Sequence, residues 1–225
     1  HEGGALDLLE AELSSLGFAC TRLPFGEGDE RIDNLFARIG DGGPHLCFAG
    51  HTDVVPVGDE AAWTHGAFDA EISDGRLYGR GAADMKGGIA AFVAAAARVL
   101  ERAPDGSISL LITGDEEGDA VNGTVKMVEW AAANGHQPDM CIVGEPTGMR
   151  VATGHKGKTA VEATCIGAEA HSALAPTAVN AIHLACDLIA EIRTIQDELA
   201  ANGTQDDAFD VPYTTLHAGL IHGGV

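Results

Sequence analysis

Basic residues are scarce in this chain. Its 225 residues include 13 lysines and arginines against 34 aspartates and glutamates, which gives a formal net charge of -21 with histidine neutral. A surface with so much negative charge repels phosphate backbones and anionic lipid headgroups. We therefore expect no nucleic-acid partner and no membrane partner, and we expect most of the acids to form a solvated surface.

Long hydrophobic runs are also absent. The longest apolar stretches, such as IAAFVAAAARVL at residues 89–100, stop well short of the roughly 20 residues that span a bilayer. No basic segment followed by an apolar stretch and a small-residue cleavage site opens the sequence. Because 45% of the residues are apolar, the chain can still bury a core. The sequence predicts a globular cytoplasmic protein.

Paired cysteines are missing as well. None of the five cysteines forms a CxxC pair, and four lie inside apolar segments. This pattern favours small buried side chains over disulfides or a thiolate metal site. The five are Cys20, Cys47, Cys141, Cys165 and Cys186.

The first two thirds of the chain alternate helices with short apolar strands. Apolar residues at helical spacing predict helices at residues 5–16, 87–103 and 121–135. The expected strands are 20–25, 35–40, 44–50, 107–113 and 139–144, the last three as buried strands. Such alternation indicates an α/β sheet covered by helices on both faces.

Near residue 150 the pattern changes. Residues 158–167 and 213–224 alternate like half-exposed strands, and residues 180–201 predict a long amphipathic helix. We therefore expect a domain at residues 1–149 and a second, α+β domain at residues 150–225. Neither end of the sequence resembles a finished domain boundary, so we expect both domains to be incomplete pieces of a longer chain.

Acids and a histidine follow the predicted strands where each strand ends. His51 and Asp53 follow the first buried strand, the acids at 115–117 follow the second, and Glu145 follows the third, whereas Asp84 precedes a predicted helix. In open α/β sheets, ligands bind at the carboxyl ends of the strands because the loops there converge. The residues expected to meet at one edge of the sheet are His51, Asp84, Glu116, Glu117 and Glu145.

Carboxylates gathered in this way repel one another unless a cation lies among them. One histidine nitrogen and several carboxylate oxygens suit Zn²⁺, Mn²⁺ or Co²⁺, and carboxylates can bridge two ions. Asp53 can accept the second ring N–H of His51. Of Glu116 and Glu117, one can bind metal while the other remains a general base. Each motif alone has an ordinary explanation, such as a helix cap at Asp84 or a solvated acidic loop; their joint placement predicts a metal site.

Four motifs carry a resemblance to a known family: GHTDVVPVGD at 50–59, LYGRGAADMKGG at 77–88, ITGDEEG at 112–118 and VGEPT at 143–147. They are similar to motifs of the zinc-dependent aminoacylase and carboxypeptidase family of the M20 type, and the resemblance covers nearly the whole chain. It implies a zinc-exopeptidase-like catalytic domain with a mixed sheet covered by helices. It also implies an inserted ferredoxin-like α+β lid domain, through which the family forms homodimers.

The resemblance further implies a hydrolase with two zinc ions per subunit, which Co²⁺ or Mn²⁺ can replace. His51 and Glu145 would hold one zinc ion, Asp84 would bridge both ions, and Glu117 would bind the second. Another histidine of the family's second site would come from a segment beyond Val225, so we expect this second site to be incomplete here.

Three further roles follow from the resemblance. Glu116 would be the general base, and Asp53 would orient His51. His171, in GAEAHSALAP at 167–176, matches a lid histidine that the family donates across the dimer to the oxyanion. The peptide after the bridging acid, Asp84–Met85, is expected to be cis.

The two parts of the chain resemble different branches of the family. Residues 1–147 are most similar to members that desuccinylate succinyl-diaminopimelate in lysine biosynthesis. From residue 148 onward the chain is more similar to members that deacetylate acetylornithine in arginine biosynthesis. The substrate expected is therefore a small N-acyl diamino acid: succinyl-diaminopimelate is the main reading, and acetylornithine is the alternative. A third reading is an inactive metal-binding or dimerisation fragment.

Overall fold

The computed structural model describes residues 4–102 and 105–224. The chain divides into two units, His1–Gly154 and His155–Val225. Within the described residues, the first unit holds the sheets and three α-helices, and the second holds one long α-helix.

The first unit is built on a mixed five-stranded sheet. In spatial order its strands are β1 (Ala19–Arg22), β2 (Leu35–Ile39), β6 (Ser107–Thr113), β3 (His45–His51) and β7 (Met140–Val143). β2 is antiparallel to both of its neighbours, whereas β3 runs parallel to β6 and β7. The three parallel strands therefore end at the same edge of the sheet.

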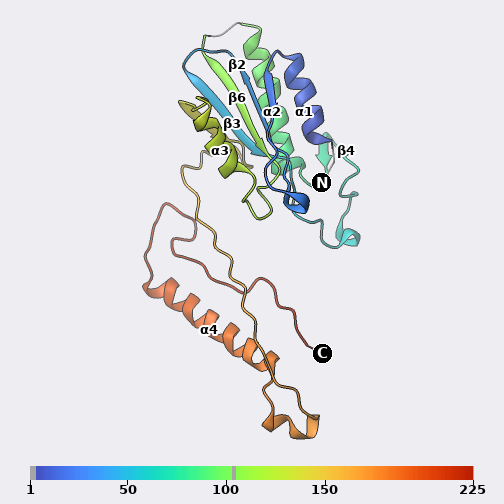
Figure 1. Cartoon of the computed structure of the whole chain (residues 1–225), viewed down its shortest axis with the longest axis vertical. Coiled ribbons are helices and arrows are strands. Elements are labelled where there is room, and N and C mark those ends of the chain that lie inside the picture. Colours follow the sequence, from blue (N-terminus) through green and yellow to red (C-terminus); the bar gives the residue numbers. More distant parts are fainter. Residues whose placement is uncertain (1–3, 103–104, 225) are drawn as a thin grey trace. The chain divides into compact units, whose positions relative to one another are not determined.

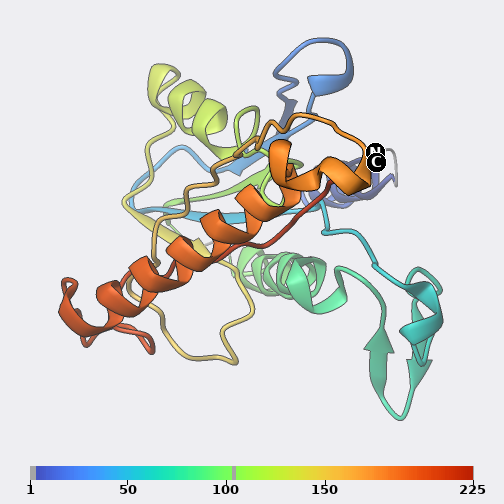
Figure 2. The same ribbon diagram turned by 90° about the horizontal axis from the view of Figure 1, so that it is seen from below.

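Helices cover both faces of this sheet, as predicted. α1 (Ala5–Ser15) and α2 (Gly87–Leu100) lie on one face and α3 (Thr124–Ala133) lies on the other (Figures 1 and 2). Successive side chains of β6 alternate between the faces: Leu110 packs with the α1 and α2 side, and Leu111 packs with Met127 of α3. The predicted helices and the first strand are all present but shorter than expected, and residue 103 of the predicted second helix lies outside the described residues.

The sequence prediction missed a small hairpin. β4 (Glu71–Ser73) and β5 (Arg76–Tyr78) pair through Ser73 and Arg76, so the loop is Asp74–Gly75. Both loop residues have positive φ angles, 50° and 73°, as a type I′ turn requires. An Asp-Gly pair is a recognised hairpin signal, but strands of three residues are too short to show an alternating pattern.

Strand β7 corrects another expectation. It was predicted as a buried strand, yet all four of its residues are exposed because it lies at the edge of the sheet and pairs only with β3. Its Cys141 is exposed, as is Cys186, and only Cys47 of the five cysteines is buried. All five are free thiols, and the expectation that the cysteines are buried is wrong for Cys141 and Cys186. An apolar run predicts a strand correctly without showing which strand is the edge.

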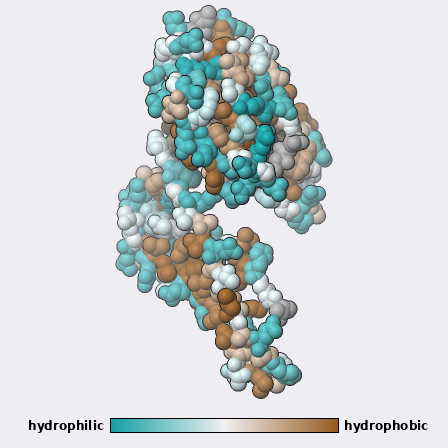
Figure 3. Space-filling view, in the orientation of Figure 1, coloured by the Kyte–Doolittle hydropathy of each residue, from teal (hydrophilic) through white to brown (hydrophobic). Residues whose placement is uncertain are grey.

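The second unit forms its predicted helix but not its predicted strands. α4 spans Ala181–Asn202 with Asn180 as its N-cap, and a 3₁₀ segment spans Ser172–Thr177. Residues 158–167 and 213–224 form no strand ladder; the described part of this unit contains one isolated bridge, between Ala168 and Val179. None of its described residues is buried. Strands need a packed face, and this unit's apolar side chains stay at its surface, where Figure 3 shows them in brown around α4.

No α-helix in the described part of the chain is long and apolar enough to cross a membrane.

Candidate metal centre

Three loops leave the sheet at the same edge. β3 ends at His51, β6 ends just before the acidic turn at 115–117, and β7 ends two residues before Glu145. His51 pairs with Thr113 in the parallel register, and the next amide, that of Thr52, donates to the Thr113 carbonyl at 2.9 Å. This register aligns the strand ends, so the loops beyond them converge.

Asp84 reaches the same place from a turn at Ala82–Lys86, directly before α2. The start of this helix lies against the segment that carries Glu145, because a Cβ atom at Gly88 would lie only 2.8 Å from the Gly144 carbonyl oxygen. Only glycine permits so close an approach. The Asp84–Met85 peptide is cis, as the family resemblance implied.

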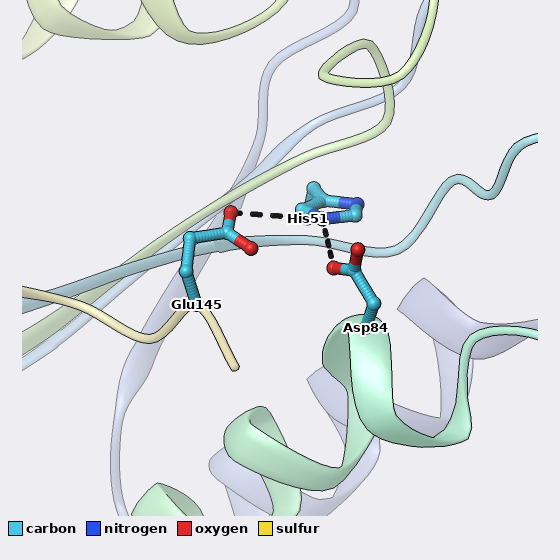
Figure 4. Close-up of side chains that lie close together, drawn as sticks. All are labelled: His51, Asp84 and Glu145. Carbon is cyan, nitrogen blue, oxygen red and sulfur yellow. Dashed lines mark hydrogen bonds and ion pairs between the residues drawn. The ribbon is translucent and has the colours of Figure 1, made fainter. Parts of the chain in front are cut away.

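One group of possible ligands consists of His51, Asp84 and Glu145. Nε2 of His51 lies 3.1 Å from Oδ1 of Asp84 and 3.7 Å from Oε1 of Glu145 (Figure 4). His51 is 1% exposed, whereas the two carboxylates are partly open to solvent. One ligand atom from each residue lies within 4.8 Å of the others, which is close enough for all three to hold one ion.

A second group consists of His51, Glu116 and Glu117, again with ligand atoms within 4.8 Å of one another. Nε2 of His51 lies 3.9 Å from Oε2 of Glu116. The two groups share His51 as their only nitrogen ligand among the described residues. The structure thus brings together all five residues that the sequence prediction placed at this edge.

Asp53 connects the histidine to the acidic turn. Its Oδ2 atom accepts hydrogen bonds from the backbone N–H groups of Glu116, at 3.0 Å, and Glu117, at 2.8 Å. Nδ1 of His51 lies 3.1 Å from the Asp53 carbonyl oxygen and 3.4 Å from Oδ1 of its carboxylate. Both oxygens are acceptors, so a neutral His51 that keeps its proton on Nδ1, toward Asp53, turns its Nε2 lone pair to the acids. Asp53 thus lies beside His51 as expected, and its backbone carbonyl oxygen is nearer to Nδ1 than its carboxylate is.

The charges of the site favour a bound cation. Burial raises the pKa of Glu117, and the charges of Asp84 and Glu116 raise it further. Burial also raises the pKa of Glu145, and Asp84 and Glu116 add to this effect against the opposing charge of His51. Burial opposes protonation of His51, but its hydrogen bond and the surrounding acids outweigh burial, and its pKa is raised. Each group therefore holds positive charge, as a proton, more tightly than usual, and the donor set fits a divalent metal ion.

The sequence prediction gave no role to Asp115, the first acid of the turn. Its side chain is buried and accepts three backbone hydrogen bonds, from Ala120 at 3.0 Å and from Val121 and Asn122 at 2.9 Å. Buried Asn34 anchors the same loop, because its Nδ2 donates to the Asn122 carbonyl at 3.0 Å. Aspartate signals a turn in which it bonds its own backbone two residues on, but these amides lie five to seven residues on, so the local sequence does not display this role.

His171 lies in the second unit, at the start of the 3₁₀ segment. Its Nδ1 atom accepts the backbone N–H of Ala173 at 3.1 Å, and the residue is exposed. A neutral imidazole that accepts at Nδ1 carries its proton at Nε2. His171 therefore presents an N–H donor to its surroundings.

The chain is similar to known proteins over most of its length. A family model described as peptidase family M20/M25/M40 matches residues 47–218. The succinyl-diaminopimelate desuccinylase of Rhodospirillum centenum is 58% identical over 187 residues, which cover 80% of this chain and 48% of that protein. The succinyl-diaminopimelate desuccinylase of Rhodopseudomonas palustris is 48% identical over 228 residues, which cover 97% of this chain and 58% of that protein.

A solved structure shares the fold. The M20 family metallo-carboxypeptidase Sso-CP2 of Sulfolobus solfataricus is 27% identical, with a TM-score of 0.54 over 62% of this chain and 31% of its own. The chain thus spans about half the length of the curated relatives it matches.

Proposed function

The chain belongs to the peptidase family M20/M25/M40, and on that premise we propose that it is part of a metal-dependent hydrolase that removes a succinyl group from an N-succinyl diamino acid. The observation that carries this proposal is the convergence of His51 with four carboxylates at the end of the parallel strands. The names of the relatives point to the substrate, succinyl-diaminopimelate, and hence to lysine biosynthesis.

The metal would be Zn²⁺, with Co²⁺ or Mn²⁺ as alternatives, and two ions per subunit. His51 and Glu145 would hold one ion, Asp84 would bridge to the second, and Glu117 would bind that second ion. When bound, such ions act as Lewis acids that polarise the scissile carbonyl and make water easier to deprotonate.

Glu116 is the residue we propose as general base. Its side chain is half exposed, and its backbone is held by Asp53, so the carboxylate stands at the rim of the cluster. It would take a proton from the attacking water and return that proton to the nitrogen of the leaving amine. The products are succinate and a free diamino acid.

The second unit would serve as the lid and dimerisation domain, completed as a ferredoxin-like α+β fold. Its exposed apolar side chains, among them Ile182 and Leu220, are consistent with burial against further structure. His171 would act from this lid, across a homodimer, by donating its Nε2–H to the oxyanion. Asp53 would keep His51 oriented.

The succinyl substrate is favoured over the acetyl alternative. Residues from 148 onward resemble acetylornithine deacetylases in their motifs, but the Rhodopseudomonas palustris desuccinylase matches 97% of the chain, including this part. The reading as an inactive fragment is not favoured either, because the same relatives are amide hydrolases by name.

The decisive experiment compares substrates and a single variant. With zinc added, the protein should hydrolyse N-succinyl-L,L-diaminopimelate faster than N-acetylornithine. Glu116→Gln should reduce turnover by about 10²–10⁴-fold, the usual contribution of a general base, and should leave zinc binding intact. Amine release and bound zinc per chain, by elemental analysis, are the two readouts.

Glu129→Gln is the matched control, since Glu129 lies on the surface of α3 in an exposed pair with Lys126. It should keep both activity and zinc. Faster hydrolysis of the acetyl substrate would overturn the substrate proposal. Full turnover in Glu116→Gln would overturn the assignment of the base, and unchanged zinc binding in His51→Gln would overturn the metal site.

A further inference from the structure

Two cysteines lie opposite one another on neighbouring strands. Cys47 of β3 pairs with Cys141 of β7 in the parallel register, so both side chains point to the same face of the sheet. Cys47 is buried in the apolar cluster of that face, with Leu111 and Met127. Cys141 is exposed at the sheet edge. The pair therefore consists of one buried thiol and one accessible thiol.

The two thiols interact unequally. A hydrogen bond with Cys47 lowers the pKa of Cys141, against the opposing effect of burial, and a backbone hydrogen bond from Ala49 lowers it further. The same hydrogen bond raises the pKa of Cys47, which burial raises as well. Cys141 is thus the thiol that ionises first. The thiolate is the form that reacts with peroxides.

We propose that Cys47 and Cys141 form a thiol pair that hydrogen peroxide oxidises to a disulfide. The Cys141 thiolate attacks one peroxide oxygen and breaks the O–O bond, which gives a sulfenic acid and hydroxide; a proton from solvent turns the hydroxide into water. The Cys47 sulfur then attacks the Cys141 sulfur, an S–S bond forms, and the sulfenic hydroxyl leaves as water with the Cys47 proton. Two thiols are oxidised and one peroxide is reduced to two waters.

The backbone spacing suits this bond. Neighbouring strands lie about 4.8 Å apart, within the roughly 4.4–6.8 Å between Cα atoms that disulfides span. β7 can adjust to the bond because it is hydrogen-bonded to the sheet on one side only.

The position of the pair gives it a consequence for the metal centre. Cys47 lies four residues before His51 on β3, and Cys141 lies four residues before Glu145 on β7. A disulfide would tie together the two strands that present these ligands. Oxidation should therefore slow hydrogen exchange of the β7 amides, a readout independent of enzymatic activity.

The test uses the reduced 225-residue chain treated with one equivalent of hydrogen peroxide, followed by alkylation and mass spectrometry. The expected product has lost two alkylatable thiols, carries a peptide link between Cys47 and Cys141, and returns to the starting mass with dithiothreitol. Cys141 should be consumed several-fold faster than Cys186, which is also exposed but lies on α4.

Three serine variants separate the roles. Cys47→Ser should leave Cys141 as a sulfenic acid that dimedone traps, Cys141→Ser should leave Cys47 reduced, and Cys186→Ser should form the disulfide as the unaltered chain does. Equal oxidation rates at Cys141 and Cys186, or Cys141 overoxidised with Cys47 still reduced, would overturn the proposal.

Discussion

The two units of this chain differ in how much packing accompanies their local structure. In the first, helices and strands bury one another's apolar faces, and residues such as Leu13, Leu110 and Met127 are almost completely inaccessible. In the second, the 22-residue helix α4 forms, yet no described residue of the unit is buried. Local signals therefore suffice for a helix, whereas a sheet and a core depend on distant segments that meet.

The largest expected effect comes from truncating a buried side chain of the first unit, compared with truncating a side chain of α4. Leu110→Ala should lower the free energy of unfolding of the first unit by about 2–5 kcal/mol, because Leu110 is 0% exposed and its removal leaves a cavity. Ile189→Ala, at a half-buried position of α4, should change the same free energy of unfolding by less than about 0.5 kcal/mol. Both tryptophans, Trp63 and Trp130, lie in the first unit, so fluorescence during urea unfolding reports on that unit.

Similar losses of unfolding free energy in Leu110→Ala and Ile189→Ala would contradict this contrast between the units. Circular dichroism at a helical wavelength, recorded on the same samples, includes α4 and shows whether the second unit unfolds with the first.

A smaller effect is expected where the first unit positions its acids. Asp115→Asn replaces a carboxylate that accepts three backbone N–H groups with an amide that can oppose one of them. We expect a loss of about 1–3 kcal/mol in unfolding free energy and weaker zinc binding, because the loop holds Glu116 and Glu117. Calorimetric titration with zinc measures the second effect.

Asp119→Asn is the control for this change, since Asp119 is an exposed acid of the same loop and should bind zinc normally. Equal zinc affinity in Asp115→Asn and the unaltered chain would show that the loop keeps its shape without the buried carboxylate.

A third effect concerns pH in the metal-free protein. The pKa values of Glu117, Glu145 and His51 are all raised in the folded chain. A group with a raised folded pKa contributes stability below its unfolded pKa, and this contribution is lost as pH rises through the folded value. In EDTA the unfolding temperature should therefore fall as pH rises through the folded pKa values of these groups, and zinc should reverse the fall.

Glu145→Gln removes one of the three titrating groups, so its unfolding temperature should depend less steeply on pH. A slope unchanged by this substitution would mean that the pH dependence arises elsewhere in the chain.

The sequence predicts those features that nearby residues determine, and it misses those that depend on residues far apart in the chain. The helices and the strands of the main sheet follow from periodicity within a few residues. The cluster of possible metal ligands follows because His51, Glu116, Glu117 and Glu145 come at or just after the ends of the parallel strands and Asp84 comes just before α2. The exposure of β7 could not be predicted, since edge position is a property of strand order. Asp115 was missed because its partners are backbone amides, which no residue pattern displays.

The second unit shows the same limit. Residues 158–167 alternate as a strand should, yet alternation describes only one partner of a sheet, and the described residues pair in a single bridge. The Asn180 cap lies within three residues of the amides it satisfies, so the helix start is encoded locally.

The smallest expected effect tests whether α4 depends on local signals alone. The Asn180 side chain accepts the N–H groups of Ile182, at 2.9 Å, and His183, at 3.2 Å. Asn180→Ala should cost the helix about 1 kcal/mol and increase hydrogen exchange over its first turn, while tryptophan fluorescence of the first unit keeps its unfolding midpoint. Asn180→Asp retains an acceptor and should restore protection. If Asn180→Ala and Asn180→Asp show equal protection from hydrogen exchange in the first turn, contacts other than the cap determine where α4 starts. The contrast between the two units would then be weaker than their burial indicates.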